Sequence, residues 1–471
     1  MRSRIASSLE SLLPEIPATA RAALPRGVRA VTAEEAAEPP PLPPELNWRD
    51  YTMMLLHTAA EIEHSLMVQY LFAAYSLGGP QVPDGLKQSV RRWQEVILGI
   101  AKEEMGHLVT VQNLTRFVGG TLKLDREDVP WSSPFYPFDF ALERLTLDSL
   151  ARYICAESPP DWKGAEADEI RKRAEGDGGA VVNRVGALYE RLSSILGDPG
   201  LVVTDDLRPR TYPYQASWDE WGRGYRRGLR GQEAGKVSQD AAPELLVIDV
   251  YSRESALAAL EQIGEQGEAL VSAGDETSHF RRFLTIYDEL KQLPDDDRGL
   301  VTRPLATNPR TTPGPEGVIT DPEALCWAHL FNVRYRMLLL DVAHAFRLAG
   351  PLDGSARNAR GLLVNRAFAE MYNLRAIAGM LVQLPLEQEG SASDLAAGPP
   401  FEMPYTLELP LGKRDCWLLH RDVYEAAGSC IGAAQELASG AAERYLVALA
   451  EEDATALRQI ERILAPTEVP V

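Results

Sequence analysis

The stretch Glu103-Glu-Met-Gly-His107 decides the fold that we expect, because it places acids and a histidine inside a helix with one apolar side. Residues three or four positions apart fall on the same face of an α-helix. The apolar face of this helix runs through Trp93, Ile97, Ile100 and Val111. Glu104 and His107 fall on that face, whereas Glu103 falls beside it. We therefore expect Glu104 and His107 to point into a core and Glu103 to be solvated.

A helix predicted over residues 48 to 77 carries an acid on its apolar face in the same way. Glu63 lies in the series Leu56, Ala59, Met67 and Tyr70. Gly78-Gly79-Pro80 ends this helix, and Gly119-Gly120 ends the next one. Because only a short loop joins the two helices, we expect them to be antiparallel neighbours.

Two further helices are predicted at 252–272 and 276–292. In the first, Glu268 lies closer than Glu265 to the apolar face of Leu257, Leu260 and Val271. In the second, Glu276 and His279 align with Phe283 and Ile286. This is a second Glu-x-x-His pair on an apolar face. A third such pair, Glu61 and His64, points away from the apolar face of its helix.

Other segments surround these four helices. Residues 121–251 form a long insert, in which the prolines and aromatics of 130–138 predict an ordered loop and 245–250 reads as a strand or a buried linker. Helices are also predicted at 146–157, 180–196, 321–349, 358–384, 420–438 and 441–464. The expected domains are an N-terminal arm with a proline-rich linker (1–45), a helical domain with inserts (46–410) and a C-terminal helical extension (411–471).

Several carboxylates in one apolar interior would repel each other and lose hydration, and two metal ions would remove both costs. Ferritin-like di-iron or di-manganese bundles use this ligand set: one acid on each of two helices and a Glu-x-x-His pair on each of two others. The predicted ligands are Glu63, Glu104, His107, Glu268, Glu276 and His279, holding two iron ions, with manganese as the alternative. The predicted fold is mainly α, a ferritin-like four-helix bundle with long inserts between helices two and three and additional C-terminal helices. Four isolated histidines are expected to be structural: His57, His329, His344 and His420.

The composition excludes several other classes. The chain has 471 residues and a net charge of −20, so nucleic acid and anionic membranes are poor partners. No apolar run reaches the roughly 18 residues of a membrane-spanning helix. The four cysteines lack Cys-x-x-Cys spacing, and the N-terminus lacks the apolar core of a secretory signal. We therefore expect a cytoplasmic protein without a disulfide framework.

Several segments resemble one known family. They are Ala59-Ala-Glu-Ile-Glu-His64, Tyr70-Leu-Phe-Ala-Ala-Tyr75, Glu103-Glu-Met-Gly-His107, Val185-Gly-Ala-Leu-Tyr189, Ile263-Gly-Glu-Gln-Gly-Glu268, Ser278-His-Phe280 and Ala397-Gly-Pro-Pro-Phe401. Together they resemble the ferritin-like domain of the iminophenyl-pyruvate dimer synthase type, whose members couple amino-acid-derived imines in violacein and indolocarbazole pathways. The resemblance spans residues 46–410. Those synthases are far longer, so we expect this chain to be the ferritin-like portion standing alone.

The expected function is a non-haem di-iron oxidase or oxygenase of secondary metabolism, such as antibiotic biosynthesis. It would activate dioxygen on a small amino-acid-derived or aromatic substrate. The resemblance implies oxidative coupling of imines as a more specific alternative. The alternatives from other functional classes are a non-enzymatic bundle that binds or stores iron and a metal-free scaffold. Self-association and an electron donor are left open.

Overall fold

The computed structural model describes residues 42, 44–127, 135–176, 182–221, 247–268, 278–350, 358–388, 390, 391 and 393–465. Within these ranges the regular structure is helical, and the few β-bridges are isolated pairs. No helix in the described part of the chain is long and apolar enough to cross a membrane. The expected mainly α fold is confirmed.

The chain divides into two compact units, and the division falls between Thr302 and Arg303. The second unit contains α13 (Pro322–Arg347), α14 (Ala359–Leu381), α15 (Lys413–Gln435) and α16 (Ala441–Leu464). The expected domain boundary at residue 410 falls inside this unit, because α13 packs against both α14 and α15. The predicted arm lies almost entirely outside the described residues.

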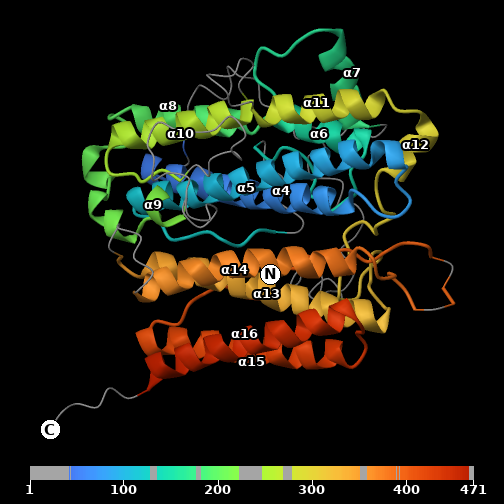
Figure 1. Ribbon diagram of the computed structural model, residues 1–471. Helices are drawn as coiled ribbons and strands as arrows, with labels where there is room; N and C mark the ends of the chain where they lie inside the picture. Colours follow the sequence, from blue (N-terminus) through green and yellow to red (C-terminus); the bar gives the residue numbers. More distant parts are fainter. Residues whose placement is uncertain are drawn as a thin grey trace, which may run out of the picture. The chain divides into compact units, whose positions relative to one another are not determined.

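Two long helices, α4 (Trp48–Ser76) and α5 (Lys87–Phe117), pack side by side in the first unit (Figure 1). α4 begins where the Asn47 side chain accepts a hydrogen bond from the Asp50 N–H, which satisfies one of the unpaired donors of a first helical turn. After α5, Gly119 has a φ of +78°, the left-handed conformation that glycine adopts readily beyond a helix end. Both helices end where the sequence predicts.

Four shorter helices complete the bundle. They are α6 (Leu147–Ala156), α8 (Gly186–Gly197), α10 (Arg253–Glu268) and α11 (His279–Lys291). α6 packs against α11 and α8 against α10, and α10 and α11 follow one another along the same side of the unit (Figure 1). The Val185 N–H donates to the Ala156 carbonyl over 2.9 Å, so α8 begins where α6 ends. Two helices with a break between them therefore fill each of the two remaining positions of the bundle.

The predicted insert at 121–251 thus supplies α6 and α8 to the bundle. The remaining short elements of the first unit are η1 (Asp84–Leu86), α7 (Ala165–Glu175), η2 (Thr204–Asp206), η3 (Pro209–Tyr214), α9 (Trp218–Trp221) and α12 (Asp295–Leu300). Phe135, Tyr136 and Phe138, from the predicted aromatic loop, lie in the hydrophobic core. Packing is therefore the role that the structure shows for these three rings.

The second unit has a charged network in its core. Arg334 donates to Glu370 over 3.0 Å and to Asp453 over 2.9 Å. In the same unit, Arg366 Nη2 lies 3.3 Å from Asp341 Oδ1. His344 Nδ1 and His420 Nε2 lie 3.0 Å apart in a buried hydrogen-bonded pair, so these two histidines, predicted to be isolated, contact each other.

Asp341 makes the stability of this unit dependent on pH. Burial raises the pKa of Asp341 to about 7, although Arg366 opposes this shift. The folded chain therefore keeps this proton at pH values where the unfolded chain has lost it, so the contribution to stability is present below about pH 4 and is lost as the pH rises through 7. We expect Asp341→Asn to melt progressively higher, relative to wild type, as the pH rises from 4 to 8. The relative gain is at most about 1.4 kcal/mol per pH unit.

Thermal melting of both proteins across this pH range measures the effect. The exposed Asp394→Asn substitution in the same unit serves as the control. A melting difference for Asp341→Asn that does not change with pH would contradict the assignment.

Candidate metal centre

Four of the six predicted ligands meet in the interior of the first unit: Glu63, Glu104, His107 and His279. Glu63 lies near the middle of α4, the next two lie on α5, and His279 is the first residue of α11. None of the four is more than 2% exposed. Glu268, the last described residue of α10, lines a small cavity together with Glu63, Glu104 and His107. Glu276 lies outside the described residues.

Glu63, Glu104 and His107 form the first group. His107 Nδ1 lies 3.1 Å from Glu104 Oε2 and 3.4 Å from Glu63 Oε2. The spacing of three residues places Glu104 and His107 about one helical turn apart, on the same face of α5. The Tyr189 hydroxyl of α8 donates to Glu63 Oε1. One atom of each group member is close enough to the others for a single ion to contact all three.

Glu104, Glu157 and His279 form the second group. His279 Nδ1 lies 2.9 Å from Glu104 Oε1 and 3.7 Å from Glu157 Oε2. The Tyr70 hydroxyl donates to Glu157 Oε1 over 2.7 Å. Glu157 was not predicted as a ligand, because it directly follows α6 and belongs to no Glu-x-x-His pair. Its one signal in the sequence is its place at the end of the helix predicted for 146–157.

The second ring nitrogen of each histidine is also held. His107 Nε2 lies 2.8 Å from Gln266 Oε1, and His279 Nε2 lies 2.8 Å from Glu103 Oε2. Because an amide oxygen and a carboxylate accept hydrogen bonds, we assign the proton of each neutral imidazole to Nε2. The lone pair of Nδ1 then faces the carboxylates. This arrangement is typical of metal-binding histidines, whose other N–H is held by a carbonyl or carboxylate.

The prediction that Glu103 is solvated was wrong. Its side chain is fully buried and forms an ion pair with Arg282 as well as the hydrogen bond to His279. Both partners belong to α11, which packs against α5 on the side next to the predicted apolar face. A helix inside a bundle is covered on more than one face, so an acid beside the apolar stripe can also be buried.

Replacing Glu103 with alanine should weaken metal binding through His279. Without the carboxylate the imidazole loses the acceptor that fixes its ring, and Arg282 loses its ion pair. Losing a hydrogen bond that orients a metal-binding side chain lowers the metal affinity by roughly 10- to 100-fold. Titration of the protein with Mn²⁺ measures this loss. Glu95→Ala, an exposed acid on the same helix, should leave the affinity unchanged, and an equal affinity for both variants would contradict the role of Glu103.

The electrostatics of the groups favour positive charge between the carboxylates. Burial and the charge of Glu104 raise the pKa of Glu63 to about 8. Burial would lower the pKa of His107, but its contacts with Glu104 and Glu63 raise it to about 10. Burial would raise the pKa of Glu104, yet His279 and His107 hold it well below its ordinary value. Protons on the two imidazoles and on Glu63 thus offset the negative charge of this centre, and metal ions would take the place of those protons.

The residues fit metal ions. Glu104 Oε1 and His279 Nδ1 are buried 2.9 Å apart, yet neither makes a well-oriented hydrogen bond within the described part of the chain. Both atoms are therefore available as ligands. Each group offers hard carboxylate oxygens and one imidazole, a set that suits iron or manganese. Glu104 belongs to both groups and would bridge two ions.

The cavity at these groups is small. Its volume is about 10 Å³, room for roughly one water-sized sphere. Leu66, Val185 and Ile263 supply apolar walls. Glu268 also lines the cavity, but its oxygens are engaged by Arg184 and by the Gly186 N–H. The structure thus places Glu268 beside the two ligand groups, not within them.

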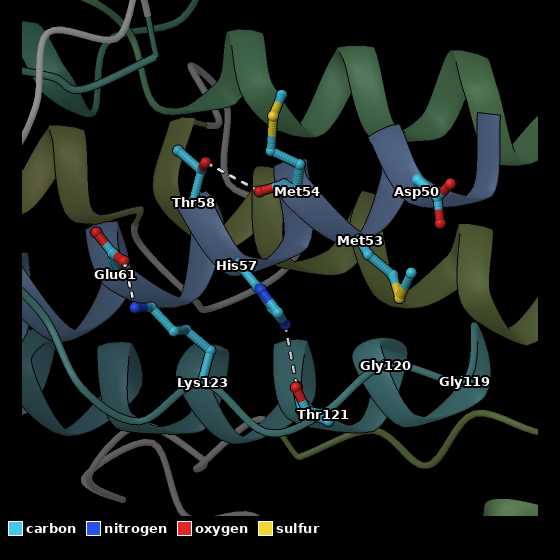
Figure 2. A pocket seen from close by; sticks show the side chains of 10 residues that line it. All are labelled: Asp50, Met53, Met54, His57, Thr58, Glu61, Gly119, Gly120, Thr121 and Lys123. Carbon is cyan, nitrogen blue, oxygen red and sulfur yellow. Dashed lines mark hydrogen bonds and ion pairs between the residues drawn. The ribbon is translucent and has the colours of Figure 1, made fainter. Parts of the chain in front are cut away.

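A larger groove, of about 600 Å³, lies on another side of α4 (Figure 2). One face of α4 from Asp50 to Glu61 lines it, together with residues between Gly119 and Lys123. His57 Nε2 donates to the Thr121 carbonyl over 3.0 Å, and Lys123 pairs with Glu61 over 2.7 Å. Glu61 and Glu63 are two residues apart, so their side chains leave α4 in nearly opposite directions. The groove therefore does not belong to the carboxylate centre.

Comparison with known proteins identifies relatives of this chain. A family model described as Ferritin-like matches residues 56–288. Dichlorochromopyrrolate synthase of Lentzea aerocolonigenes is 28% identical over 427 residues, which cover 81% of this chain and 39% of that protein. The 2-imino-3-(indol-3-yl)propanoate dimerase of Chromobacterium violaceum is 25% identical over 411 residues, which cover 78% of this chain and 35% of that protein. This chain thus spans about two fifths or less of the length of either relative.

Among solved structures, a ferritin-like protein from Caulobacter vibrioides is 19% identical, with a TM-score of 0.35, and the match covers 72% of this chain and 98% of that one. The range matched by the family model begins in α4 and ends in α11, so it contains every member of the two ligand groups: Glu63, Glu104, His107, Glu157 and His279. The resemblance to the iminophenyl-pyruvate dimer synthase type is confirmed by the two curated relatives. Residues 56–288 of this chain form a ferritin-like domain.

Proposed function

We propose that this protein is an oxidoreductase that uses two iron ions to activate dioxygen on a small aromatic or amino-acid-derived substrate. The observation that carries the proposal is the pair of buried ligand groups that share Glu104. An apolar residue would pack in this interior better than a buried carboxylate does. Packing therefore does not explain an acid that is shared by two such groups. Manganese is the alternative metal, since it accepts the same oxygen and imidazole ligands.

Each ligand group would hold one ion. Glu63, Glu104 and His107 would hold one, and Glu104, Glu157 and His279 the other. Bound iron would supply redox chemistry toward dioxygen, with an external electron donor as the reductant. Glu276, three residues before His279, stays a predicted ligand.

Neighbouring residues fix the ligands in place. The Tyr70 and Tyr189 hydroxyls each donate to one ligand carboxylate, which holds the other oxygen toward the histidines. Gln266 and Glu103 fix the two imidazole rings. A ligand set fixed in this way needs little rearrangement when an ion binds.

The names of the relatives support the substrate class. One is a dichlorochromopyrrolate synthase and the other a dimerase of an indolyl imino acid, and we extend to this chain an aromatic, amino-acid-derived substrate of secondary metabolism. Oxidative coupling of two imines is the more specific form of the proposal. Leu66, Val185 and Ile263 give the cavity apolar walls, but its volume of about 10 Å³ would have to widen to admit an aromatic ring.

Metal analysis and oxygen uptake test the proposal together. We expect the protein to bind about two iron ions per chain and to consume dioxygen when a reductant and an aromatic imino acid, generated from its amino acid, are supplied. Two bound ions without oxygen uptake on any such substrate would indicate an iron-binding or storage bundle. Protein that binds no iron or manganese would indicate a scaffold, and either result would overturn the proposed enzyme.

A further inference from the structure

Beside the ligand groups lies a site built to hold a carboxylate. Arg184 Nη2 donates to Glu268 over 3.0 and 3.3 Å, and the Gly186 N–H donates to Glu268 Oε1 over 3.0 Å. Gly186 begins α8, so the first N–H groups of that helix add partial positive charge. We refer to Arg184 and the Gly186 N–H as the carboxylate nest.

The nest depends on glycine at position 186. A Cβ atom on Gly186 would overlap the carboxylate of Glu268. Its φ is not in the left-handed region, so the backbone itself does not require glycine there. The missing side chain makes room for the carboxylate. Arg184 is further held by Glu190 over 2.8 Å, which keeps the guanidinium in position whatever occupies the nest.

The acid in the nest is close to the proposed ions. Glu268 lines the same small cavity as Glu63, Glu104, His107 and Glu157. Gly267, its neighbour in α10, approaches Glu157 so closely that a Cβ atom would lie 3.0 Å from Glu157 Oε2. A rotation of the Glu268 side chain out of the nest can therefore bring its carboxylate toward the ligand groups.

The geometry points to an exchange of carboxylates: the nest binds the carboxylate of the substrate, and Glu268 then moves from the nest to the metal ions. This inference rests on the proposed function and names the substrate as an organic acid, such as an amino-acid-derived imino acid. One carboxylate replaces another on the same donors, so the hydrogen bonds of the nest are conserved. The displaced Glu268 gains the ions as partners. Substrate and metal would consequently strengthen each other's binding by the same factor.

Space next to the nest suits the body of such a substrate. A Cβ atom on Gly264, which also lines the cavity, would meet no atom of the described residues within 4 Å. The described part of the chain therefore leaves space beside α10 at this residue. Ile263 and Val185 lie beside it as apolar surface, so an acid held by Arg184 could place an aromatic group there.

Calorimetric titration with Mn²⁺ tests the exchange without relying on turnover. We expect indole-3-propionate to tighten Mn²⁺ binding to the full-length protein by about tenfold, whereas uncharged indole-3-propionamide has no effect. In Gly186→Ala the new methyl group expels Glu268 and blocks the nest. This variant should bind Mn²⁺ tightly without the acid and should not respond to it. Arg184→Gln should also lose the response.

Gly197→Ala is the matched control, because it lies on the same helix and its Cβ would make only an ordinary contact of 3.9 Å. It should respond to the acid like wild type. Wild-type protein that binds Mn²⁺ equally with and without indole-3-propionate, or Gly186→Ala protein that binds Mn²⁺ more weakly than Gly197→Ala, would overturn the exchange alone. Absence of Mn²⁺ and Fe²⁺ binding in all four proteins would overturn the proposed function as well.

Discussion

Glu104→Ala is expected to remove both metal ions and to abolish oxygen uptake. Glu104 Oε2 faces His107, and Glu104 Oε1 faces His279, so one substitution takes an oxygen from each ligand group. The remaining ligands are Glu63 with His107 on one side and Glu157 with His279 on the other. We expect metal content to fall from about two ions per chain to near zero and oxygen uptake to fall by at least about 100-fold.

Metal content after gel filtration and oxygen uptake with reductant measure these losses. Glu95→Ala, an exposed acid on the same helix, should keep both ions. Circular dichroism should show the same helix content for both variants. Retention of two ions by a folded Glu104→Ala protein would show that Glu104 does not bridge them.

The positions of Glu63, Glu104, His107 and His279 could be predicted because each lies on an apolar face with regular helical spacing. For these residues burial follows from periodicity alone. The same argument fails for Glu103, which lies beside the face but is covered by α11. Covering by a neighbouring helix depends on how the helices pack, and the spacing within one helix does not contain that information.

The arrangement of the shorter helices explains the other differences. Glu157 directly follows α6, and Glu268 is the last described residue of α10. Both acids reach the centre because the third and fourth positions of the bundle are each filled by two helices. The sequence predicts helices at 146–157 and 252–272, but it does not show that Glu157 and Glu268 lie near Glu63. Glu268 was predicted as a ligand from its helical phase, whereas in the structure Arg184 and the Gly186 N–H hold it.

The segment before α10 shows a similar limit. Its apolar residues 245–250 suggest a strand or a buried linker, and the described part, 247–250, is a buried linker without strand pairing. The Ile248 N–H donates to Thr110 Oγ1, and the Val250 N–H donates to Gln215 Oε1. Side chains far away in the sequence thus replace the partner strand. Local sequence cannot reveal such partners.

Glu157→Ala should separate the two ligand groups. Glu157 belongs only to the group with His279, so its loss should release one ion and leave the ion held by Glu63, Glu104 and His107. Tyr70 would also lose the carboxylate that accepts its hydrogen bond. Metal content should fall from about two ions to one. Oxygen uptake should nevertheless fall nearly as far as in Glu104→Ala, because the proposed chemistry would require both ions.

Glu175→Ala, the exposed last residue of α7, is the control for a change of charge near this part of the bundle and should retain both ions. The number of ions lost by Glu104→Ala and by Glu157→Ala decides whether the two ligand groups are separate sites. If the two variants lose the same number of ions, the two groups cannot be occupied independently. If Glu157→Ala retains two ions, Glu276 rather than Glu157 completes the group of His279. Only the loss of a single ion agrees with two sites joined at Glu104.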